Sequence, residues 1–194
     1  MAAVLVVCTG NVCRSPVAEG FVRATLRSRF GASAPSVASA GVAGWEHSGA
    51  DPNSIEAAAE RGIDISAHRG RLLRPQDVRE AELVLAMATE HVEEVVGEHP
   101  DAVGRTFTLK ALVRLLETLP PADGEPLRER IAQADALRRS GFEGNPYDDD
   151  VADPLGLPID AFRAMTWEIG EWVARLDVGL FGPAVQAPRA ADGG

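Results

Sequence analysis

The chain has 194 residues, of which 45% are hydrophobic and 25% are charged, and these values suit a single globular domain with a sizeable core. Its formal net charge of −10 at pH 7 argues against a general nucleic-acid binder and against binding to anionic membranes. No apolar run approaches the roughly 20 residues of a membrane span, no signal peptide is recognised, and two cysteines make no secreted disulfide framework, so we expect a cytoplasmic protein.

The first predicted strand leads through a short loop into a helix. The apolar run of residues 4–7 is typical of a short buried strand, and residues 9–11 are turn formers. Ser15 and Pro16 predict the start of a helix, with Ser15 as N-cap and Pro16 in the first position, and helical spacing continues to Gly31. A loop between a buried strand and a helix N-terminus is a geometry that holds a phosphate.

The residue types around this loop suit nucleophilic chemistry on a phosphate. Cys8 and Arg14 stand at its two ends with five residues between them. A helix N-terminus favours the thiolate form of a cysteine, which is a nucleophile, and an arginine offers a planar fork of donors for two phosphate oxygens. We expect Gly10 to adopt a positive φ, Asn11 to tolerate the left-handed region and bond across the loop, and Ser15 to donate to the sulfur.

The spacing of cysteine and arginine is weak on its own, because a cysteine that ends a strand is more often inert packing. The Walker phosphate loop is excluded, since it requires a Gly-Lys pair that the chain lacks. The preceding strand, the Gly-Asn pair and the Ser-Pro pair favour the functional interpretation.

The stretch V-C-T-G-N-V-C-R-S-P-V-A-E, at residues 7–19, resembles the signature of the low molecular weight protein tyrosine phosphatases. The resemblance continues in residues 39–41, Trp45, 62–68, 83–87 and 153–154, so it covers most of residues 3–177. It implies a two-step hydrolysis in which Cys8 attacks phosphorus and no metal or other cofactor takes part. The implied phosphate-binding residues are Thr9, Gly10, Asn11, Val12, Cys13 and Arg14, acting through backbone N–H groups and the guanidinium.

Asp153 is the predicted general acid. A phosphate ester needs a proton on its leaving oxygen, and a carboxylic acid can supply it. Pro154 restricts Asp153 to extended conformations, and the pair matches the general-acid loop of the family. The acidic triplet at residues 148–150 is expected to be a solvated loop. Leu155 stands where the family often has an aromatic residue, which removes one stacking surface from the substrate cleft.

The resemblance also implies supporting roles for Ser39 and His68. It places His68 behind the phosphate loop, hydrogen-bonded toward Asn11 and Ser39, where it shapes the loop. The family usually has an aspartate at the position of Ala88, and that aspartate orients the histidine. An acidic residue at position 82 or 90 would have to take its place.

Two other residues keep two interpretations each. Trp45 is either an aromatic wall of the substrate cleft, as the resemblance implies, or an anchor for a glycine-rich loop. Cys13 is either a small apolar filler or, as the resemblance implies, the partner of Cys8 in a reversible disulfide.

Strands that alternate with helical patterns predict an α/β doubly wound fold in one domain, with the loop at the C-terminal end of the first strand. The resemblance implies a four-stranded parallel sheet. The predicted domain spans residues 1–180, and residues 181–194 are expected to be a disordered tail. An added helix in residues 120–147 would either cover the cleft or pack against the edge of the sheet. Other strands are expected at 35–40, 83–87 and 105–108, and other helices after Asp51, after a Thr89 cap, over 109–119 and over 159–176.

The resemblance predicts a protein tyrosine phosphatase that acts on phosphorylated proteins. Val12 favours phosphotyrosine, because members that resemble protein-arginine phosphatases carry threonine there. Arsenate reductase is an alternative with the same loop, but no cysteine follows Cys13, so it would need external thiols. A phosphate-binding module without catalysis is the last alternative, and the joint presence of Cys8, Arg14 and Asp153 argues against it.

Overall fold

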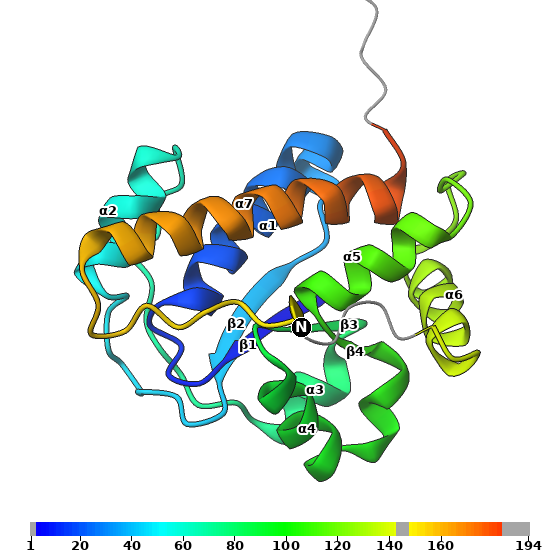
Figure 1. Ribbon diagram of the computed structural model, residues 1–194, viewed down its shortest axis with the longest axis horizontal. Coiled ribbons are helices and arrows are strands. Elements are labelled where there is room, and N and C mark those ends of the chain that lie inside the picture. The colour runs from blue at the N-terminus through cyan, green and yellow to red at the C-terminus, as the bar shows by residue number, and fades with distance from the viewer. Residues whose placement is uncertain (1–2, 143–147, 184–194) are drawn as a thin grey trace, which may run out of the picture.

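The computed structural model describes residues 3–142 and 148–183, which form a parallel sheet of four strands with helices on both faces (Figure 1). The strands are β1 (Val4–Cys8), β2 (Val37–Gly41), β3 (Leu83–Ala86) and β4 (Thr106–Thr108). They lie in the order β2-β1-β3-β4, and every pairing is parallel. This confirms the predicted doubly wound fold.

Helices cover the two faces of the sheet unequally. The α-helices are α1 (Arg14–Phe30), α2 (Pro52–Glu60), α3 (Pro75–Glu80), α4 (Thr89–Glu98), α5 (Leu109–Thr118), α6 (Leu127–Arg139) and α7 (Ile159–Phe181), with short 3-10 helices at Gly31–Ser33 and Pro100–Arg105. In Figure 1, α1, α5 and α7 lie over one face, and α3 and α4 lie under the other. None of these helices is long and apolar enough to cross a membrane.

The buried strand β1 shows how the sheet divides the core. Val4, Val6 and Cys8 pack into the larger apolar cluster with α1, α5 and α7, while Leu5 and Val7 pack into the smaller one with α3 and α4. Successive side chains of a strand point to opposite faces, so a strand covered on both sides is apolar throughout. The continuous apolar run in the sequence therefore reflects burial on both faces.

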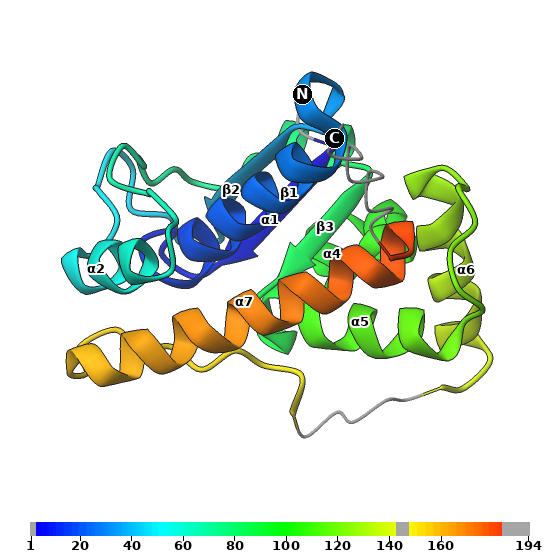
Figure 2. The ribbon, with the colours of Figure 1, turned by 90° about the horizontal axis from the view of Figure 1, so that it is seen from above.

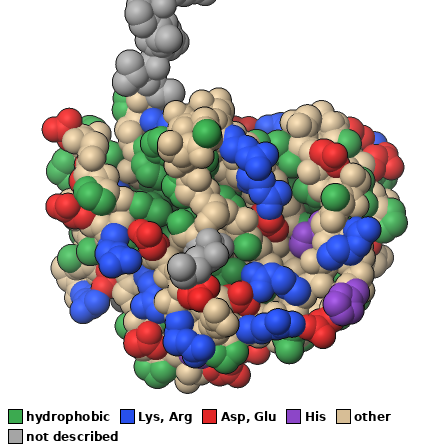
Figure 3. Space-filling model, turned by 180° about the vertical axis from the view of Figure 1, so that it is seen from behind, with side chains coloured by type: hydrophobic (Ala, Val, Ile, Leu, Met, Phe, Trp, Pro, Cys, Tyr) green, Lys and Arg blue, Asp and Glu red, His purple; other side chains and the backbone are tan. Residues whose placement is uncertain are grey.

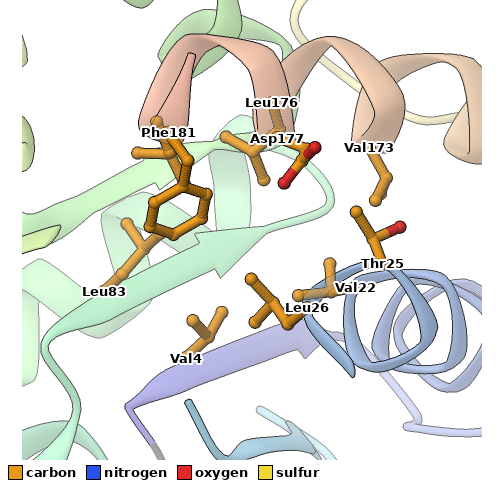
Figure 4. A pocket seen from close by; sticks show the side chains of 10 residues that line it. Val4, Val22, Thr25, Leu26, Leu83, Val173, Leu176, Asp177 and Phe181 are labelled. Atoms are coloured by element: carbon orange, nitrogen blue, oxygen red, sulfur yellow. The ribbon is translucent and has the colours of Figure 1, made fainter. Parts of the chain in front are cut away.

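The C-terminal part of α7 closes the larger core at the end of the sheet where the strands begin. Figure 4 shows Val4 and Leu83, which begin β1 and β3, facing Leu176 and Phe181 of α7 across a small apolar cavity. The ring of Phe181 also meets Phe30 of α1 edge-on, with 5.0 Å between centroids. The helix thus continues through Phe181, where the sequence predicted a tail, and residues 184–194 lie outside the described part of the chain.

Two predicted helix caps are wrong and one is confirmed. Helix α1 begins two residues earlier than expected, with Cys13 at the N-cap position, so Ser15 lies inside the helix. Thr89 is the first residue of α4 and Ala88 precedes it as N-cap. Asp51 caps α2 as predicted, and its carboxylate accepts a 2.8 Å hydrogen bond from the N–H of Asn53.

The added helix α6 contacts the edge strand β4 and lies far from the loop that follows β1 (Figure 2). Arg138 of α6 donates hydrogen bonds to the carbonyl oxygens of Thr106 in β4, at 2.9 Å, and of Val103, at 2.5 Å. Of the two expected placements, over the cleft or against the edge of the sheet, the structure shows the second. Residues 143–147, which complete the predicted segment, lie outside the described part.

Candidate active site

The candidate site lies where the strand order changes direction. The chain leaves β1 toward β2 on one side, while β3 continues to β4 on the other, and ligands bind at such a point beyond the carboxyl ends of the strands. Backbone hydrogen bonds extend this edge: the N–H of Met87 donates to Val7 at 2.9 Å, and the N–H of Val151 donates to Met87 at 2.8 Å. The loop with Asp153 therefore lies next to the loop that follows Cys8.

The loop of residues 9–13 has its carbonyl groups tied to the surrounding protein. The carbonyl oxygens of residues 8, 9, 10 and 12 accept hydrogen bonds of 2.9–3.0 Å from the N–H groups of residues 42, 43, 45 and 51. Within the described residues, the N–H groups of residues 9–13 donate to no protein acceptor. Buried N–H groups are rarely left unpaired, and N–H groups that converge in this way form a site that suits an anion.

Asn11 holds the loop in shape. Its φ is +57°, and its side chain is fully buried. The amide donates to Ser15 Oγ at 2.9 Å and to Ser39 Oγ at 2.8 Å, and its Oδ1 accepts from the N–H of Arg71 at 3.0 Å. The expectation for Asn11 is confirmed. The expectation that Gly10 has a positive φ is wrong, since Asn11 alone among residues 9–13 has one.

Ser15 uses its hydroxyl for the sulfur. The Oγ of Ser15 lies 2.9 Å from the Sγ of Cys8. Because the amide of Asn11 donates to the same Oγ, the hydroxyl proton of Ser15 is left to point at the sulfur. A hydroxyl donor at this distance favours the thiolate form of a cysteine.

Arg14 and Asp153 meet although 139 residues separate them. The buried guanidinium of Arg14 donates from Nη2 to Asp153 Oδ2 at 2.6 Å and to Thr9 Oγ1 at 3.0 Å, and from Nη1 to the carbonyl of Val151 at 3.3 Å. Its Nε has no partner within the described residues. The structure therefore brings the predicted nucleophile, cation and acid to one place.

His68 lies behind the loop, but its contacts differ in part from the expectation. Its Nε2 lies 2.8 Å from the carbonyl oxygen of Asn11, which can only accept, so Nε2 carries the proton. Ser39 instead donates to a carboxylate oxygen of Glu19 at 2.5 Å, and that oxygen lies 3.9 Å from His68 Nδ1. Burial lowers the pKa of His68, which keeps the ring neutral near pH 7.

The acidic residue beside His68 is Glu19, and not residue 82 or 90 as the absence of the family aspartate at Ala88 suggested. Glu19 is mostly buried on α1 and also pairs with Arg23. Glu90 lies next to a different histidine, with its Oε1 3.4 Å from the Nε2 of His91. The carboxylate nearest to His68 therefore lies on α1, the helix that follows the loop, and not at the end of β3.

Two exposed apolar side chains flank the site. Trp45 is 50% exposed, and a Cβ built on Gly10 would lie 3.7 Å from its ring, so the indole lies against the loop that follows Cys8. Leu155 is 44% exposed, and its N–H donates to Asp153 Oδ1 at 3.1 Å. Because the ring is half exposed, Trp45 fits the interpretation as a wall of the substrate cleft better than the interpretation as an anchor that is buried in the core.

The acidic triplet lies in a loop in which Asp148 and Asp150 are exposed, as expected, but its three carboxylates are also paired with neighbouring elements. Asp148 contacts Lys110 at 3.1 Å and Arg114 at 2.9 Å, and Asp149 also pairs with Arg114. Asp150 accepts from the N–H and the hydroxyl of Thr89, at 2.7 and 2.9 Å. The triplet ties the segment before Asp153 to α5 and to the start of α4.

Both cysteines are free thiols and buried. Burial raises the pKa of Cys13 to about 12, so this thiol stays protonated at neutral pH and suits the filler interpretation. Among residues 3–142 and 148–183, no three His, Cys, Asp or Glu side chains come together as metal ligands do.

Sequence reasoning missed three residues that support the loop: Glu19, Arg71 and His91. Arg71 donates from its backbone to Asn11, and from its side chain to the carbonyl of Ser39 at 2.8 Å. His91 is buried, with its Nε2 3.0 Å from Thr9 Oγ1. Glu19 had one signal in the sequence, because it lies four residues after Ser15 and thus on the same face of α1.

Comparisons with known proteins agree with the geometry. The family model for low molecular weight phosphotyrosine protein phosphatase matches residues 3–119. The chain is 40% identical over 106 residues to a probable low molecular weight protein-tyrosine-phosphatase, EpsP, of Ralstonia solanacearum, which covers 55% of this chain and 69% of the relative. It is 34% identical over 173 residues to a protein-arginine-phosphatase of Geobacillus stearothermophilus, covering 89% of this chain and 92% of that protein.

The fold agrees as well. The crystal structure of a low molecular weight protein tyrosine phosphatase from T. tengcongensis has a TM-score of 0.68 to this chain at 33% identity, and the match covers 91% of this chain and 97% of the other. The resemblance carried by residues 7–19 is confirmed. The chain therefore belongs to the low molecular weight protein tyrosine phosphatase family.

Proposed function

We propose that this chain hydrolyses phosphotyrosine in proteins, with Cys8 as nucleophile, Arg14 and the N–H groups of residues 9–14 as phosphate ligands, and Asp153 as general acid. Hydrolysis of phosphate monoesters through a cysteinyl-phosphate is the reaction of the family. The observation that carries the assignment is the loop itself: its carbonyl groups are tied outward, its N–H groups donate to no acceptor in the described residues, and its thiol meets a hydroxyl donor. The proposal needs no metal or organic cofactor.

The reaction has two steps. The Cys8 thiolate attacks phosphorus in line, the sulfur–phosphorus bond forms as the phosphorus–oxygen bond breaks, and Asp153 gives its proton to the leaving oxygen. A water molecule then attacks phosphorus and the Asp153 carboxylate takes a proton from it. The sulfur–phosphorus bond breaks, which regenerates the Cys8 thiolate and releases inorganic phosphate. Arg14 and the loop N–H groups hold the phosphoryl oxygens in both steps. The hydroxyl of Ser15 stabilises the thiolate before the first step and after the second.

The surroundings of the loop support phosphotyrosine as substrate. The ring of Trp45 covers the loop at Gly10, where it can contact the aromatic ring of a bound phosphotyrosine. Val12 offers methyl groups and no hydroxyl on the phosphate loop. Both features favour an aromatic and apolar leaving group.

Phosphoarginine is the second candidate. The relative named a protein-arginine-phosphatase aligns with 89% of this chain, while the probable tyrosine phosphatase of Ralstonia aligns with 55%. Peptides of one sequence that carry phosphotyrosine or phosphoarginine separate the two. We expect a higher kcat/KM for phosphotyrosine and a shift toward phosphoarginine in the Val12→Thr variant. A preference of the unaltered protein for phosphoarginine would contradict the assignment.

The mechanism is tested by hydrolysis of para-nitrophenyl phosphate in the presence of EDTA and a reductant. We expect Cys8→Ser to abolish turnover, and Asp153→Ala to lower kcat by roughly 10²–10⁴-fold, the usual contribution of a general acid. Asp101→Ala, at a solvent-exposed carboxylate in the segment before β4, is the matched control and should leave kcat unchanged. An unaltered protein without turnover under these conditions would overturn the proposal, and arsenate reduction with external thiols would be tested next.

We also infer a cytoplasmic protein without nucleic-acid or membrane partners. The net charge is −10, and on the face shown in Figure 3 the basic side chains alternate with acidic ones in place of a continuous basic patch. Retention on a heparin or anionic-lipid surface at physiological salt would contradict this inference.

A further inference from the structure

His91 is a buried polar residue that the proposed mechanism does not use. It lies in the first turn of α4, three residues beyond the N-cap Ala88, and its side chain is 1% exposed. A neutral histidine in an apolar core usually satisfies both ring nitrogens. Here Nδ1 is buried without a partner in the described part of the chain, and only Nε2 has a close one.

That partner connects His91 to the candidate phosphate ligands. The Nε2 of His91 lies 3.0 Å from the Oγ1 of Thr9, the residue directly after Cys8. The same oxygen accepts a hydrogen bond from Nη2 of Arg14, also at 3.0 Å. One hydroxyl group thus lies between the imidazole and the guanidinium.

The surroundings determine which atom carries the proton. A carboxylate oxygen of Glu90 lies 3.4 Å from Nε2, where it would attract an N–H and repel a bare lone pair. The opposite tautomer would leave a buried N–H without an acceptor at Nδ1, which costs more than an unused lone pair. His91 therefore donates from Nε2 to Thr9. Burial, with repulsion from Arg14, lowers the pKa of His91 to about 4, so the ring is neutral at pH 7.

The direction of this hydrogen bond decides what Thr9 can do. A hydroxyl oxygen has two acceptor sites and one proton. Arg14 and His91 occupy the two acceptor sites of Thr9, so its own proton is left to donate. This donor is on the same loop whose N–H groups find no acceptor in the described residues.

We propose that His91 is a positioning residue for phosphoryl binding: through Thr9 it holds the guanidinium of Arg14 and turns the Thr9 hydroxyl into a donor to the bound phosphoryl group. The inference rests on the proposed function, because it assigns a further contact in the same site.

The kinetic test uses two substitutions of His91 and one of Thr9. His91→Gln can keep an N–H donor near the position of Nε2, and His91→Leu removes it. We expect His91→Leu to lower kcat/KM for para-nitrophenyl phosphate and to raise the inhibition constant of inorganic phosphate, each by about tenfold, the effect of one hydrogen bond to a charged ligand. His91→Gln should recover most of this loss. His99→Leu, the same change at the other end of α4, is the control and should alter neither value.

Thr9→Val makes the test specific for the proposed connection. In the Thr9→Val background, His91→Leu should cause no further loss, because the hydroxyl through which it acts is gone. Equal losses from His91→Leu in both backgrounds would show a general structural effect and overturn the inference. An absence of loss when Thr9 is intact would overturn it as well.

A spectroscopic measurement keeps the test independent of turnover and of variant folding. Nitrogen-15 NMR of the histidine rings in the unaltered protein at pH 7 should show His91 as the Nε2–H tautomer. The Nδ1–H tautomer would overturn the inference. An unaltered protein that shows the expected tautomer but hydrolyses no phosphate ester would instead contradict the proposed function, so the two failures are distinguishable.

Discussion

Asn11 shows how much of the site depends on a single amide. Both donors and the carbonyl oxygen of its side chain are used inside the protein, and its backbone lies in the left-handed region. Asparagine tolerates that region better than most residues, and its side chain is long enough to reach Ser15 and Ser39. One residue therefore sets both the backbone turn and the direction of the serine that faces the sulfur.

Asn11→Ala and Asn11→Gly separate these two contributions. Both variants lose the three side-chain hydrogen bonds, at about 1–3 kcal/mol for each buried group left unpaired, but only alanine also strains the positive φ. We expect Asn11→Gly to be more stable than Asn11→Ala by about 1 kcal/mol in urea unfolding, with kcat lowered in both. Equal stabilities of the two variants would show that the backbone conformation carries no cost.

The neutral state of His91 predicts how stability depends on pH. Its pKa is about 4 in the folded protein and 6.5 in its ordinary state, so the unfolded chain binds the extra proton first as the pH falls. The stability that the folded protein has with this ring neutral is fully present above pH 6.5. It is lost as the pH falls from about 6.5 to 4, by about 3 kcal/mol.

Urea unfolding of the unaltered protein and of His91→Gln at several pH values tests this prediction. His68, whose pKa burial also lowers, contributes in the same direction in both proteins, so their difference isolates His91. The unaltered protein should lose more stability than the variant on acidification. Parallel curves would contradict the burial of a neutral ring.

At the scale of elements, helix α1 combines the anion site with close packing. Its N-terminus follows the phosphate loop, and further along the helix Gly20 faces the segment after α2. A Cβ on Gly20 would lie 2.5 Å from Ile63 Cγ2 and 3.0 Å from Ile65 Cγ2. The missing side chain thus lets α1 approach that segment.

Gly20→Ala and Gly97→Ala are expected to have opposite effects on stability. Alanine favours helices by about 0.8–1 kcal/mol over glycine, but at Gly20 overpacking should outweigh this and destabilise the protein by about 1–2 kcal/mol. A Cβ on Gly97 in α4 would meet no atom of the described residues within 4 Å, so Gly97→Ala should be neutral to stabilising. Thermal unfolding of both variants measures the difference, and a stabilised Gly20→Ala protein would contradict the packing argument.

At the scale of the whole molecule, α6 is a stabilising addition at the edge of the sheet. Arg130 of α6 is 2% exposed and donates to the carbonyl oxygens of Gly179, at 2.9 Å, and Pro120, at 2.8 Å. It also pairs with Glu125 at 3.3 Å. These contacts join α6 to the end of α7 and to the segment after α5, and none of them reaches the phosphate loop.

Arg130→Ala should therefore lower stability without altering catalysis. We expect a loss of about 3 kcal/mol in urea unfolding, because removal of a buried cation leaves its carboxylate and carbonyl partners unpaired, and an unchanged kcat/KM for the folded enzyme. Arg128→Ala, two residues earlier on the exposed face of α6, should change stability by less than about 0.5 kcal/mol. A changed kcat/KM in Arg130→Ala would indicate that α6 influences the cleft.

The local chemistry of the loop was predictable because its parts are close together in the chain. The apolar run before Cys8, the left-handed Asn11 and the arginine at the start of a helix all lie within residues 4–19. The hydrogen-bond partner that a single side chain selects was less predictable, and Ser15 is the example. Ser15 was expected both to cap α1 and to donate to the sulfur, and only the structure shows that it lies inside the helix with its hydroxyl at the sulfur.

The sequence by itself determined the family, the parallel α/β fold and the loop between Cys8 and Arg14, because short-range patterns of burial, turn residues and capping carry that information. Only the tertiary structure decided that Glu19 and not residue 82 or 90 accompanies His68, that the acidic triplet pairs with α4 and α5, and that His91 contacts Thr9. These contacts join residues 34 to 82 positions apart. Their partners are selected by the packing of helices across the sheet, which leaves no local pattern in the chain.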